Sequence, residues 1–505
     1  MIFRRLRKFV KPRLKRYPIA FRLYEAISWT FTRSRFVLEA KRFFLRMANI
    51  VCPMWIGPRY KLARRYAAEG ELDKAMAIAD DILARKPDFN DYRWIGSIYW
   101  LRGRYRDAHR LFERMEQRRR EIACELQYDR LDIRFFPSIH FAQIGHLGML
   151  DKYIKAEILG MIPRHTNVLL GAPKEFSNPA YLRCWEKYFS WVTNPRTISL
   201  LAPLSHLLEE DVIMVRVRER TRNFVAFGAE VQTRWEAEDR GPLLVPSARH
   251  RERGYRLLRE LGVPEGAWFA GLHMREGTDR MRDVRNSDIL TYRLAIEEIA
   301  KRGGWVLRMG DPSMRPLPPS PNAIDYAHSG KREDWMDVFL WAEGRFFIAT
   351  GSGPQMIPTT FGKPVAIANY GPIATIVCGK DDILLPKHYR HEKEERYLTL
   401  AERMSPDYGF IESVDTFAVK GIRVVDNTPE ELRDLVIEMM DRLDGRHVDP
   451  EEQHALQGHF AELAVIHEVY PARLARAFVS KYRELQASGP RIELPAARHQ
   501  EVAQR

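Results

Sequence analysis

The sequence predicts an α/β protein built on parallel β-sheets, preceded by a basic arm and a short α-helical segment. Three observations predict this class. Four short apolar runs between residues 268 and 370 are separated by stretches long enough for crossover helices. A run–helix–run pattern near residues 133–171 is typical of a βαβ unit. The chain of 505 residues is 45% hydrophobic, which allows about three domains with buried cores.

Composition excludes several other classes of protein. The apolar runs fall short of the ~18 residues that cross a bilayer as a helix. The four cysteines are too few for a disulfide scaffold and lack the C-x-x-C spacing of zinc or thiol redox sites. We therefore expect a protein of the reducing cytoplasm that is either soluble or peripheral to a membrane.

Residues 1–50 form the basic arm. They contain 14 Lys and Arg against Glu25 and Glu39, so +12 of the chain's formal net charge of +14 lies there. A nucleic-acid enzyme would more often carry its basic residues on the folded domains, so we expect no nucleic-acid partner. Basic residues that alternate with aromatic and leucine side chains are typical of a segment on an anionic membrane surface. We expect this arm to lie on the inner face of the cytoplasmic membrane; a solvated tail is the alternative.

Residues 51–122 contain a repeat with a period of 33 residues. The spacing resembles the tetratricopeptide helix–turn–helix, in which alanines let paired helices approach closely. Because such repeats normally need at least about three units, we expect this pair to stack on a neighbouring segment or to bind a protein partner. An ordinary helical hairpin is the alternative. The matching positions are Tyr66, Gly70, Leu72, Ala75 and Ile78 in the first unit and Tyr99, Gly103, Tyr105, Ala108 and Leu111 in the second.

Residues 123–255 form the first expected α/β domain. A helix is expected from Ile144 to Gly160, between two apolar runs. A polar joint over Arg249–Gly254 places the end of the domain near residue 255. The expected strands are Ile133–Phe136, Val168–Gly171 and, more weakly, Ile198–Leu201 and Val212–Val215.

Residues 256–445 form the second expected α/β domain, which carries the strongest pattern in the chain. Each apolar run leads into polar or glycine-rich residues, and ligands of open sheets bind at the carboxyl ends of the strands. The expected strands are Trp268–Leu272, Trp305–Leu307, Phe346–Ala349 and Val365–Ala368, and the expected helices are Ile289–Lys301 and Trp335–Glu343. Residues 446–505 are expected to form C-terminal helices and a tail.

Two arginines and a histidine follow the first two of these strands. His273 and Arg275 are two residues apart, so they share one face if both extend the strand, and Arg308 ends the next strand. Two guanidiniums at one sheet edge suit a diphosphate, because each presents a planar fork of donors. The alternatives are an arginine paired with an acid and a histidine of the core.

A glycine-containing loop follows the third strand. Gly351-Ser352-Gly353 would let the backbone approach phosphates, and Pro354 suits the first turn of a helix whose N-terminus favours anions. A simple turn is the alternative. The chain lacks the G-x-G-x-x-G, G-x-x-x-x-G-K-[ST], D-x-D, H-E-x-x-H and G-x-S-x-G patterns, so we expect no metal, no dinucleotide cofactor and no serine esterase.

The motifs at these strand ends resemble a known family. They are His-x-Arg at 273–275, Arg-Met-Gly at 308–310, Ile324-Asp325-Tyr326, Ser352-Gly353, Asn369, Leu384–Tyr389 and Arg396-Tyr397-Leu398-Thr399. Over residues 125–445, and most strongly over 268–372, the chain resembles bacterial surface-polysaccharide glycosyltransferases, some of which carry tetratricopeptide-like N-terminal segments. The His-x-Arg element is more remotely similar to that of nucleotide-sugar fucosyltransferases, but Glu276 stands where those enzymes have a further arginine.

The resemblance implies a GT-B architecture, in which two Rossmann-like domains face a cleft. The N-terminal domain would bind a glycan or glycolipid acceptor and the C-terminal one a nucleotide-sugar, a co-substrate in place of any cofactor. Arg275 and Arg308 would neutralise the leaving diphosphate without a metal. A helical segment over residues 452–486 would cross back onto the N-terminal domain. The donor-binding residues expected are His273, Glu276, Gly310, Asp311, Asp325, Tyr326, Thr350, Gly351, Ser352, Gly353 and Asn369; for Asp325 and Tyr326 a simple strand start is an equal alternative.

Transfer to a hydroxyl is helped by a base, and His146 is the residue that we expect in this role. It follows the first strand of the N-terminal domain, and Gly145 and Gly148 would let a substrate come near. A histidine that only hydrogen-bonds its own loop is the alternative. At the level of the whole protein, the alternative to an enzyme is a non-catalytic scaffold of a membrane-associated polysaccharide-assembly complex.

Overall fold

The computed structural model describes residues 56–68, 71–84, 89–101, 104–210, 214–217, 220–276, 283–373, 379–405, 407–409, 411–447, 449, 451–466 and 473–487. The chain divides into two units, Met1–Ala108 and His109–Arg505, and each is described by itself. The basic arm 1–50, with its predicted membrane contact, lies outside the described residues. Among the helices that are described, none is long and apolar enough to cross a membrane.

The first unit consists of helices at the predicted repeat. They are α4 (Ile56–Ala68), α5 (Leu72–Leu83), α6 (Phe89–Leu101) and the start of α7 (Tyr105–Glu125), which continues into the second unit. The matching positions have matching burial: Tyr66 and Tyr99 are buried, and Ala75 and Ala108 are fully buried. Consecutive helices are therefore present at both predicted repeat units, and α4 packs on α5, whereas their assignment as tetratricopeptide repeats stays a prediction.

The second unit contains a seven-stranded parallel sheet in its C-terminal half. Its order is β15-β11-β10-β9-β6-β7-β8, and each of its pairings is parallel. All four strands predicted between residues 268 and 370 are confirmed, because apolar runs buried on both faces leave few other conformations. The strands are β6 (Phe269–His273), β7 (Trp305–Arg308), β8 (Ala323–Ile324), β9 (Phe347–Ala349), β10 (Val365–Tyr370), β11 (Ile383–Pro386) and β15 (Arg473–Leu474).

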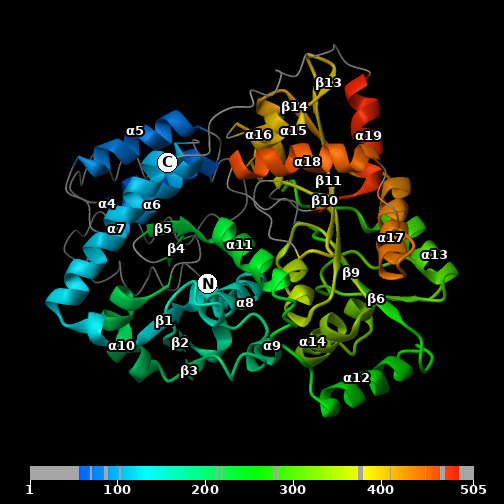
Figure 1. Cartoon of the computed structure of the whole chain (residues 1–505), viewed down its shortest axis with the longest axis horizontal. Coiled ribbons are helices and arrows are strands. Elements are labelled where there is room, and N and C mark those ends of the chain that lie inside the picture. The colour runs from blue at the N-terminus through cyan, green and yellow to red at the C-terminus, as the bar shows by residue number, and fades with distance from the viewer. Residues whose placement is uncertain are drawn as a thin grey trace, which may run out of the picture. The chain divides into compact units, whose positions relative to one another are not determined.

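The connections of this sheet run in both directions from its middle. From β6 the chain moves outward to β7 and β8, and then returns to β9 on the other side of β6. This is the strand order of a doubly wound Rossmann sheet, with β15 added, and it puts the topological switch point between β6 and β9. Helices α13 (Arg293–Lys301) and α17 (Pro429–Leu443) pack together, as do α12 (Ala248–Glu260) and α14 (Asp334–Glu343) (Figure 1).

The N-terminal half of the second unit has a smaller parallel sheet. Strands β1 (Ile133–Pro137), β2 (Thr166–Leu170) and β3 (Ser190–Val192) lie in this order, and α8 (Ile144–Ile158) connects the first two as predicted. The strand β3 was not predicted. It is only three residues long, too short to show a pattern.

One predicted strand and the predicted joint are wrong, and a second predicted strand is confirmed in part. Ile198–Leu201 lies inside helix α10 (Pro195–Leu208), because Asn194 caps the backbone N–H groups of residues 196 and 197 and Pro195 starts the first turn. Near the predicted strand Val212–Val215, strand β4 (Met214–Val217) pairs antiparallel with β5 (Arg220–Asn223) and not with the parallel sheet. The segment Arg249–Gly254 belongs to α12, which is capped by the side chain of Ser247.

The two halves of the second unit contact each other directly. Tyr181, in α9 (Pro179–Arg183), is fully buried, and its hydroxyl lies 3.1 Å from the Thr360 hydroxyl of the C-terminal half. Its ring packs against Trp341 and Phe361. The apolar core is therefore continuous across the two halves.

The last helices of the chain pack mainly on the C-terminal half. The main neighbours of α18 (Glu451–Ile466) and α19 (Arg476–Ala487) are α15, α17 and β11, so these helices do not cross back onto the N-terminal half as expected from the resemblance. The reason is local: β15 joins the large sheet beside β11 and buries Leu474. The other elements are α11 (Phe224–Ala237), β12 (His388–His391), β13 (Arg396–Tyr397), α15 (Leu400–Met404), α16 (Val414–Val419) and β14 (Ile422–Val425).

Candidate functional site

The predicted residues after β6 and β9 meet at the topological switch point. The backbone N–H of Arg275 donates to the hydroxyl of Thr350, at 2.9 Å, and this hydroxyl is fully buried. The hydroxyl of Ser352 lies 3.3 Å from Nδ1 of His273. The strand ends therefore bring together four of the residues predicted from the sequence, in the position where open α/β sheets bind ligands.

His273 is an uncharged member of this group. Its side chain is nearly buried, and burial, followed by the positive charges of Arg308 and Arg275, lowers its pKa to about 4. At neutral pH the imidazole is therefore neutral. It can exchange hydrogen bonds with a ligand, whereas the positive charge of the site comes from arginine.

Arg275 is held by a carboxylate that the sequence analysis did not identify. Nη2 of Arg275 lies 3.1 Å from Oδ2 of Asp283, whose side chain is 2% exposed. The same carboxylate accepts from Arg285, through Nε at 2.9 Å and Nη2 at 2.6 Å. Burial would raise the pKa of Asp283, but the hydrogen bonds and charges of the two arginines outweigh it and lower this pKa. Nothing in the local sequence marks this pair, because the Asp-x-Arg spacing is equally typical of a surface ion pair.

A buried lysine lies behind the same segment. Nζ of Lys387 donates to the backbone carbonyl of Asn286 at 2.7 Å and to Asp426 at 2.6 Å. Its side chain is 3% exposed, and burial lowers its pKa. Lys387 follows β11, a strand that was not predicted; it lies in the motif Leu384–Tyr389, but no role was assigned to it from the sequence.

Arg308 ends β7 as predicted, but its side chain does not face the switch point as an exposed guanidinium. It ends β7, one strand away from the switch point, and its side chain is fully buried. Nη2 donates to the backbone carbonyl of Arg315 at 2.9 Å, and Nη1 lies 3.4 Å from Oδ1 of Asp325. These contacts hold the loop 309–322 that follows β7. Arg308 therefore matches the alternative interpretation, an arginine that is paired with an acid.

Two more predicted residues hold the same loop. Asp325 also accepts from the backbone N–H of Leu317, at 2.7 Å, and pairs with His328 at 2.9 Å. Glu276 accepts from the backbone N–H of Arg315 at 2.5 Å. Three side chains from different elements thus fix one proline-containing loop beside the switch point.

The polar atoms of several other predicted residues have internal partners. The hydroxyl of Tyr326 is bonded to the backbone of Glu333, and the amide of the buried Asn369 is bonded to Ser287 and Asn427. Asp311 accepts from the backbone N–H of Ser313, which lowers the pKa of the carboxyl, in the turn that follows Gly310. The predicted nucleotide contacts of these residues gain no support from this geometry.

The predicted glycines serve contacts within the protein. A Cβ at Gly353 would lie 2.6 Å from the backbone nitrogen of Gly145, and one at Gly351 would lie 3.0 Å from the ring of Tyr370. The predicted helix after this loop is wrong. Gly353–Met356 and the following Pro358–Phe361 are short 3₁₀ turns, because Pro358 has no N–H to continue an α-helix from Pro354. Gly353 therefore lets the two halves approach each other, whereas the predicted contact of this loop with a phosphate stays a prediction.

His146 lies in the first turn of α8, next to this contact. Its Nδ1 is 2.6 Å from the backbone carbonyl of Ile139. A carbonyl can only accept, so Nδ1 carries the proton and Nε2 of the neutral ring is left as an acceptor. Because Gly145 touches Gly353, and consecutive Cα atoms are 3.8 Å apart, the Cα atoms of His146 and Ser352 are within roughly 12 Å of each other.

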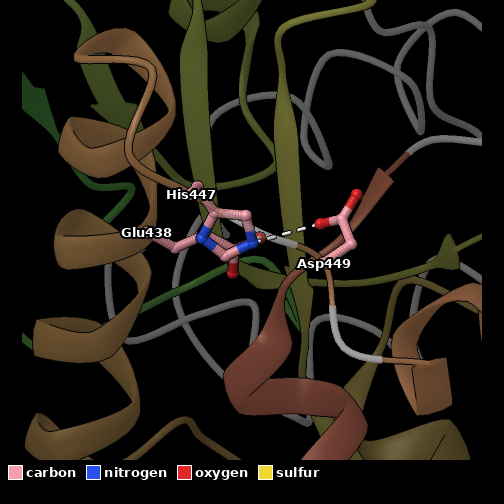
Figure 2. Close-up of side chains that lie close together, drawn as sticks. All are labelled: Glu438, His447 and Asp449. Atoms are coloured by element: carbon pink, nitrogen blue, oxygen red, sulfur yellow. Dashed lines mark hydrogen bonds and ion pairs between the residues drawn. The ribbon is translucent and has the colours of Figure 1, made fainter.

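A group of metal-ligand residue types lies away from this site. Figure 2 shows Glu438, on α17, together with His447 and Asp449. Nη2 of Arg442 pairs with Glu438 at 2.7 Å and also with Asp449, and Arg473 pairs with Asp449 at 3.0 Å. The two carboxylates are thus paired with guanidiniums, and the network ties α17 to β15.

Comparison with known proteins gives distant similarities only. No protein-family model matches the chain, and no curated protein sequence matches it. The glycosyl transferase family 9 structure from Veillonella parvula DSM 2008 is 14% identical over 46% of this chain and 66% of its own, with a TM-score of 0.26. The E. coli ADP-heptose LPS heptosyltransferase II is 12% identical over 62% of this chain and 98% of its own, with a TM-score of 0.34. The dodecameric iron-containing heptosyltransferase TibC, in complex with ADP-D-β-D-heptose, is 10% identical over 63% of this chain and 79% of its own, with a TM-score of 0.33.

Proposed function

We propose that the protein is a glycosyltransferase that moves a hexosyl or deoxyhexosyl group from a nucleotide-sugar to a cell-surface glycan or glycolipid. One observation carries this proposal. The contact between Gly145 and Gly353 brings the carboxyl edge of the small sheet, with His146, to the switch point of the large sheet, with His273, Arg275 and the Thr350–Ser352 loop. A group suited to take a proton thus lies near a group suited to hold a phosphate.

The switch point supplies what a nucleotide-sugar donor requires. The guanidinium of Arg275 is 37% exposed, stays charged at any relevant pH and is fixed by Asp283. When the bond between the anomeric carbon and the phosphate oxygen breaks, its electron pair goes to the diphosphate, and a fixed positive charge stabilises the product as it forms. The neutral His273 and the hydroxyl of Ser352 can orient the donor by hydrogen bonds. This account needs no metal ion.

The small sheet supplies the base for the acceptor. As the acceptor oxygen bonds to the anomeric carbon, its proton goes to Nε2 of His146. The hydrogen bond from Nδ1 to Ile139 keeps this nitrogen unprotonated in the neutral ring and fixes the orientation of the ring. The contact with Ile139 is also what a purely structural histidine would make, so the mutant test must separate turnover from nucleotide affinity.

The basic arm and the helical repeat support a proposal about where this reaction occurs. We propose that residues 1–50 hold the enzyme on the anionic inner surface of the cytoplasmic membrane, where glycolipid acceptors are assembled. We propose that the helices of the first unit bind a protein partner. These roles would suit a non-catalytic scaffold equally well.

Nucleotide-dependent protection separates an enzyme from a scaffold. We expect at least one of the UDP-, GDP-, ADP-, CMP- and dTDP-sugars to raise the melting temperature of the full chain, because a ligand at 100 times its Kd stabilises the folded state by ~2.7 kcal/mol. Arg275→Ala should abolish this protection. If none of the nucleotide-sugars at millimolar concentration protects the wild-type protein, the scaffold is the better account.

A further inference from the structure

We infer that Arg285 is the second phosphate-binding arginine of the site and binds one diphosphate together with Arg275. The inference rests on the proposed function and names a binding residue for it. The sequence pattern had assigned this role to Arg308, which ends β7 and is fully buried. Arg285 has the exposure, the position and the fixed geometry that the role requires.

One buried carboxylate orients both guanidiniums. Asp283 accepts from Arg285 through Nε and Nη2, and from Arg275 through Nη2 at 3.1 Å. A backbone bridge from Asp283 to Ser413, and the hydrogen bond from the N–H of Val284 to the carbonyl of Glu412, fix the segment that carries it. Because both side chains are already held, binding a ligand costs little further conformational entropy.

Both arginines belong to the segment that follows β6, and Arg285 reaches across the switch point to the loop that follows β9. The backbone of Arg275 continues from β6 and is bridged to Asn286, next to Arg285. The side-chain Cγ of Arg285 lies 3.5 Å from the Cβ position of Gly351, so its stem passes over the loop that follows β9. A ligand at the crevice between β6 and β9 would therefore have one guanidinium at each strand end.

Exposure and charge distinguish this pair from Arg308. The side chains of Arg275 and Arg285 are 37% and 25% exposed, so each keeps surface for a ligand beyond Asp283. The other partner of Arg285, Glu412, is 3.4 Å away and 54% exposed, so a multivalent anion can displace it. Lys387, close behind, pairs with Asp426 and donates to the carbonyl of Asn286, so it fixes the backbone next to Arg285. Two planar forks beside one another suit two linked phosphates better than a single carboxylate.

Pyrophosphate, the part shared by all nucleoside diphosphates, is the probe that tests the inference. Its binding to the full chain is measured by isothermal titration calorimetry in EDTA. We expect Arg285→Ala and Arg275→Ala each to weaken pyrophosphate binding by at least about tenfold. Arg285→Lys should weaken this binding less, because lysine keeps the positive charge but lacks the planar pair of donors of a guanidinium. Arg293→Ala is the matched control: Arg293 is 65% exposed on α13 and pairs only with Glu297 in the described structure. It should bind pyrophosphate like the wild type.

The outcomes separate this inference from the proposed function. If Arg285→Ala, folded by circular dichroism, binds pyrophosphate within twofold of the wild type, the inference is wrong even where nucleotide-sugars are turned over. A wild-type protein that does not bind millimolar pyrophosphate overturns it as well. If pyrophosphate binds through both arginines but no nucleotide-sugar reacts, the inference stands and the proposed reaction does not.

Discussion

The contact between Gly145 and Gly353 gives the sharpest test of how the two sheet edges meet. A Cβ at Gly145 would lie 2.8 Å from the Cα of Gly353. Carbon atoms pack at about 3.5–4.0 Å, and the obstacle is backbone, so in Gly145→Ala the two edges must separate by about 1 Å. Overpacking of this kind costs ~1–3 kcal/mol, of which the better helix propensity of alanine returns at most ~1 kcal/mol.

The same displacement should reduce turnover. A misplacement of about 1 Å between a catalytic group and its substrate can lower the rate by ~10²-fold, while the arginines of the large sheet and their anion affinity stay as they are. The assays are urea denaturation and nucleotide release. Gly458→Ala in α18 is the control, because no atom lies within 4 Å of that Cβ position and alanine should be neutral or stabilising there. Wild-type stability and turnover in Gly145→Ala would refute the close contact.

Three further predictions concern the membrane, the metal and pH. Deletion of residues 1–50 should release the protein from phosphatidylserine vesicles, and binding of the full chain should weaken with salt, since screening lengths are ~8–10 Å at physiological ionic strength; salt-insensitive binding contradicts a membrane-surface arm. Turnover should persist in EDTA but fall ~10²–10³-fold in Arg275→Ala, with incomplete rescue by lysine; abolition by the chelator would exclude this mechanism. Burial raises the pKa of Asp337 from 3.8 to about 7. Between pH 4 and pH 7 this carboxyl is therefore protonated in the native state and ionised in the unfolded chain. Wild-type stability should therefore fall relative to Asp337→Asn as pH rises from 4 to 7, and parallel pH profiles in urea denaturation would contradict the raised pKa.

The sequence was informative where one physical constraint decided the structure. Four apolar runs, separated by segments long enough for crossover helices and each followed by polar or glycine-rich residues, together favoured strands of a parallel sheet. The residues after β6 and β9 were therefore expected at one edge. The secondary structure of residues 198–201 could not be predicted in this way, because a run of four residues without such flanking segments suits a strand and a helix equally. Its N-terminal signal, Asn194 followed by Pro195, favoured the helix.

The site was only partly predictable, because no local sequence pattern determines the order of the strands in a sheet. Arg275 and Arg308 look equivalent in the sequence, because each follows or ends an apolar strand. In the sheet, β6 borders the switch point and β7 is one strand further away. The side chain of Arg308 is buried, whereas that of Arg275 is 37% exposed. Arg285 follows no predicted strand, and the position of its stem over Gly351 is a tertiary contact. The contact of Gly353 with Gly145 was not predicted, because close approach to a phosphate and close approach to another backbone require the same residue.

Release of nucleotide from nucleotide-sugars tests the central claim most directly. The purified full chain is incubated in EDTA with each of the UDP-, GDP-, ADP-, CMP- and dTDP-sugars and a bacterial glycolipid extract. We predict that one nucleotide class is released, that Arg275→Ala loses donor binding, and that His146→Ala lowers turnover by ~10²–10⁴-fold while nucleotide affinity stays within a few-fold. Near-normal turnover in His146→Ala would move the base elsewhere, with Glu276 the next candidate. No release from any donor would contradict the account.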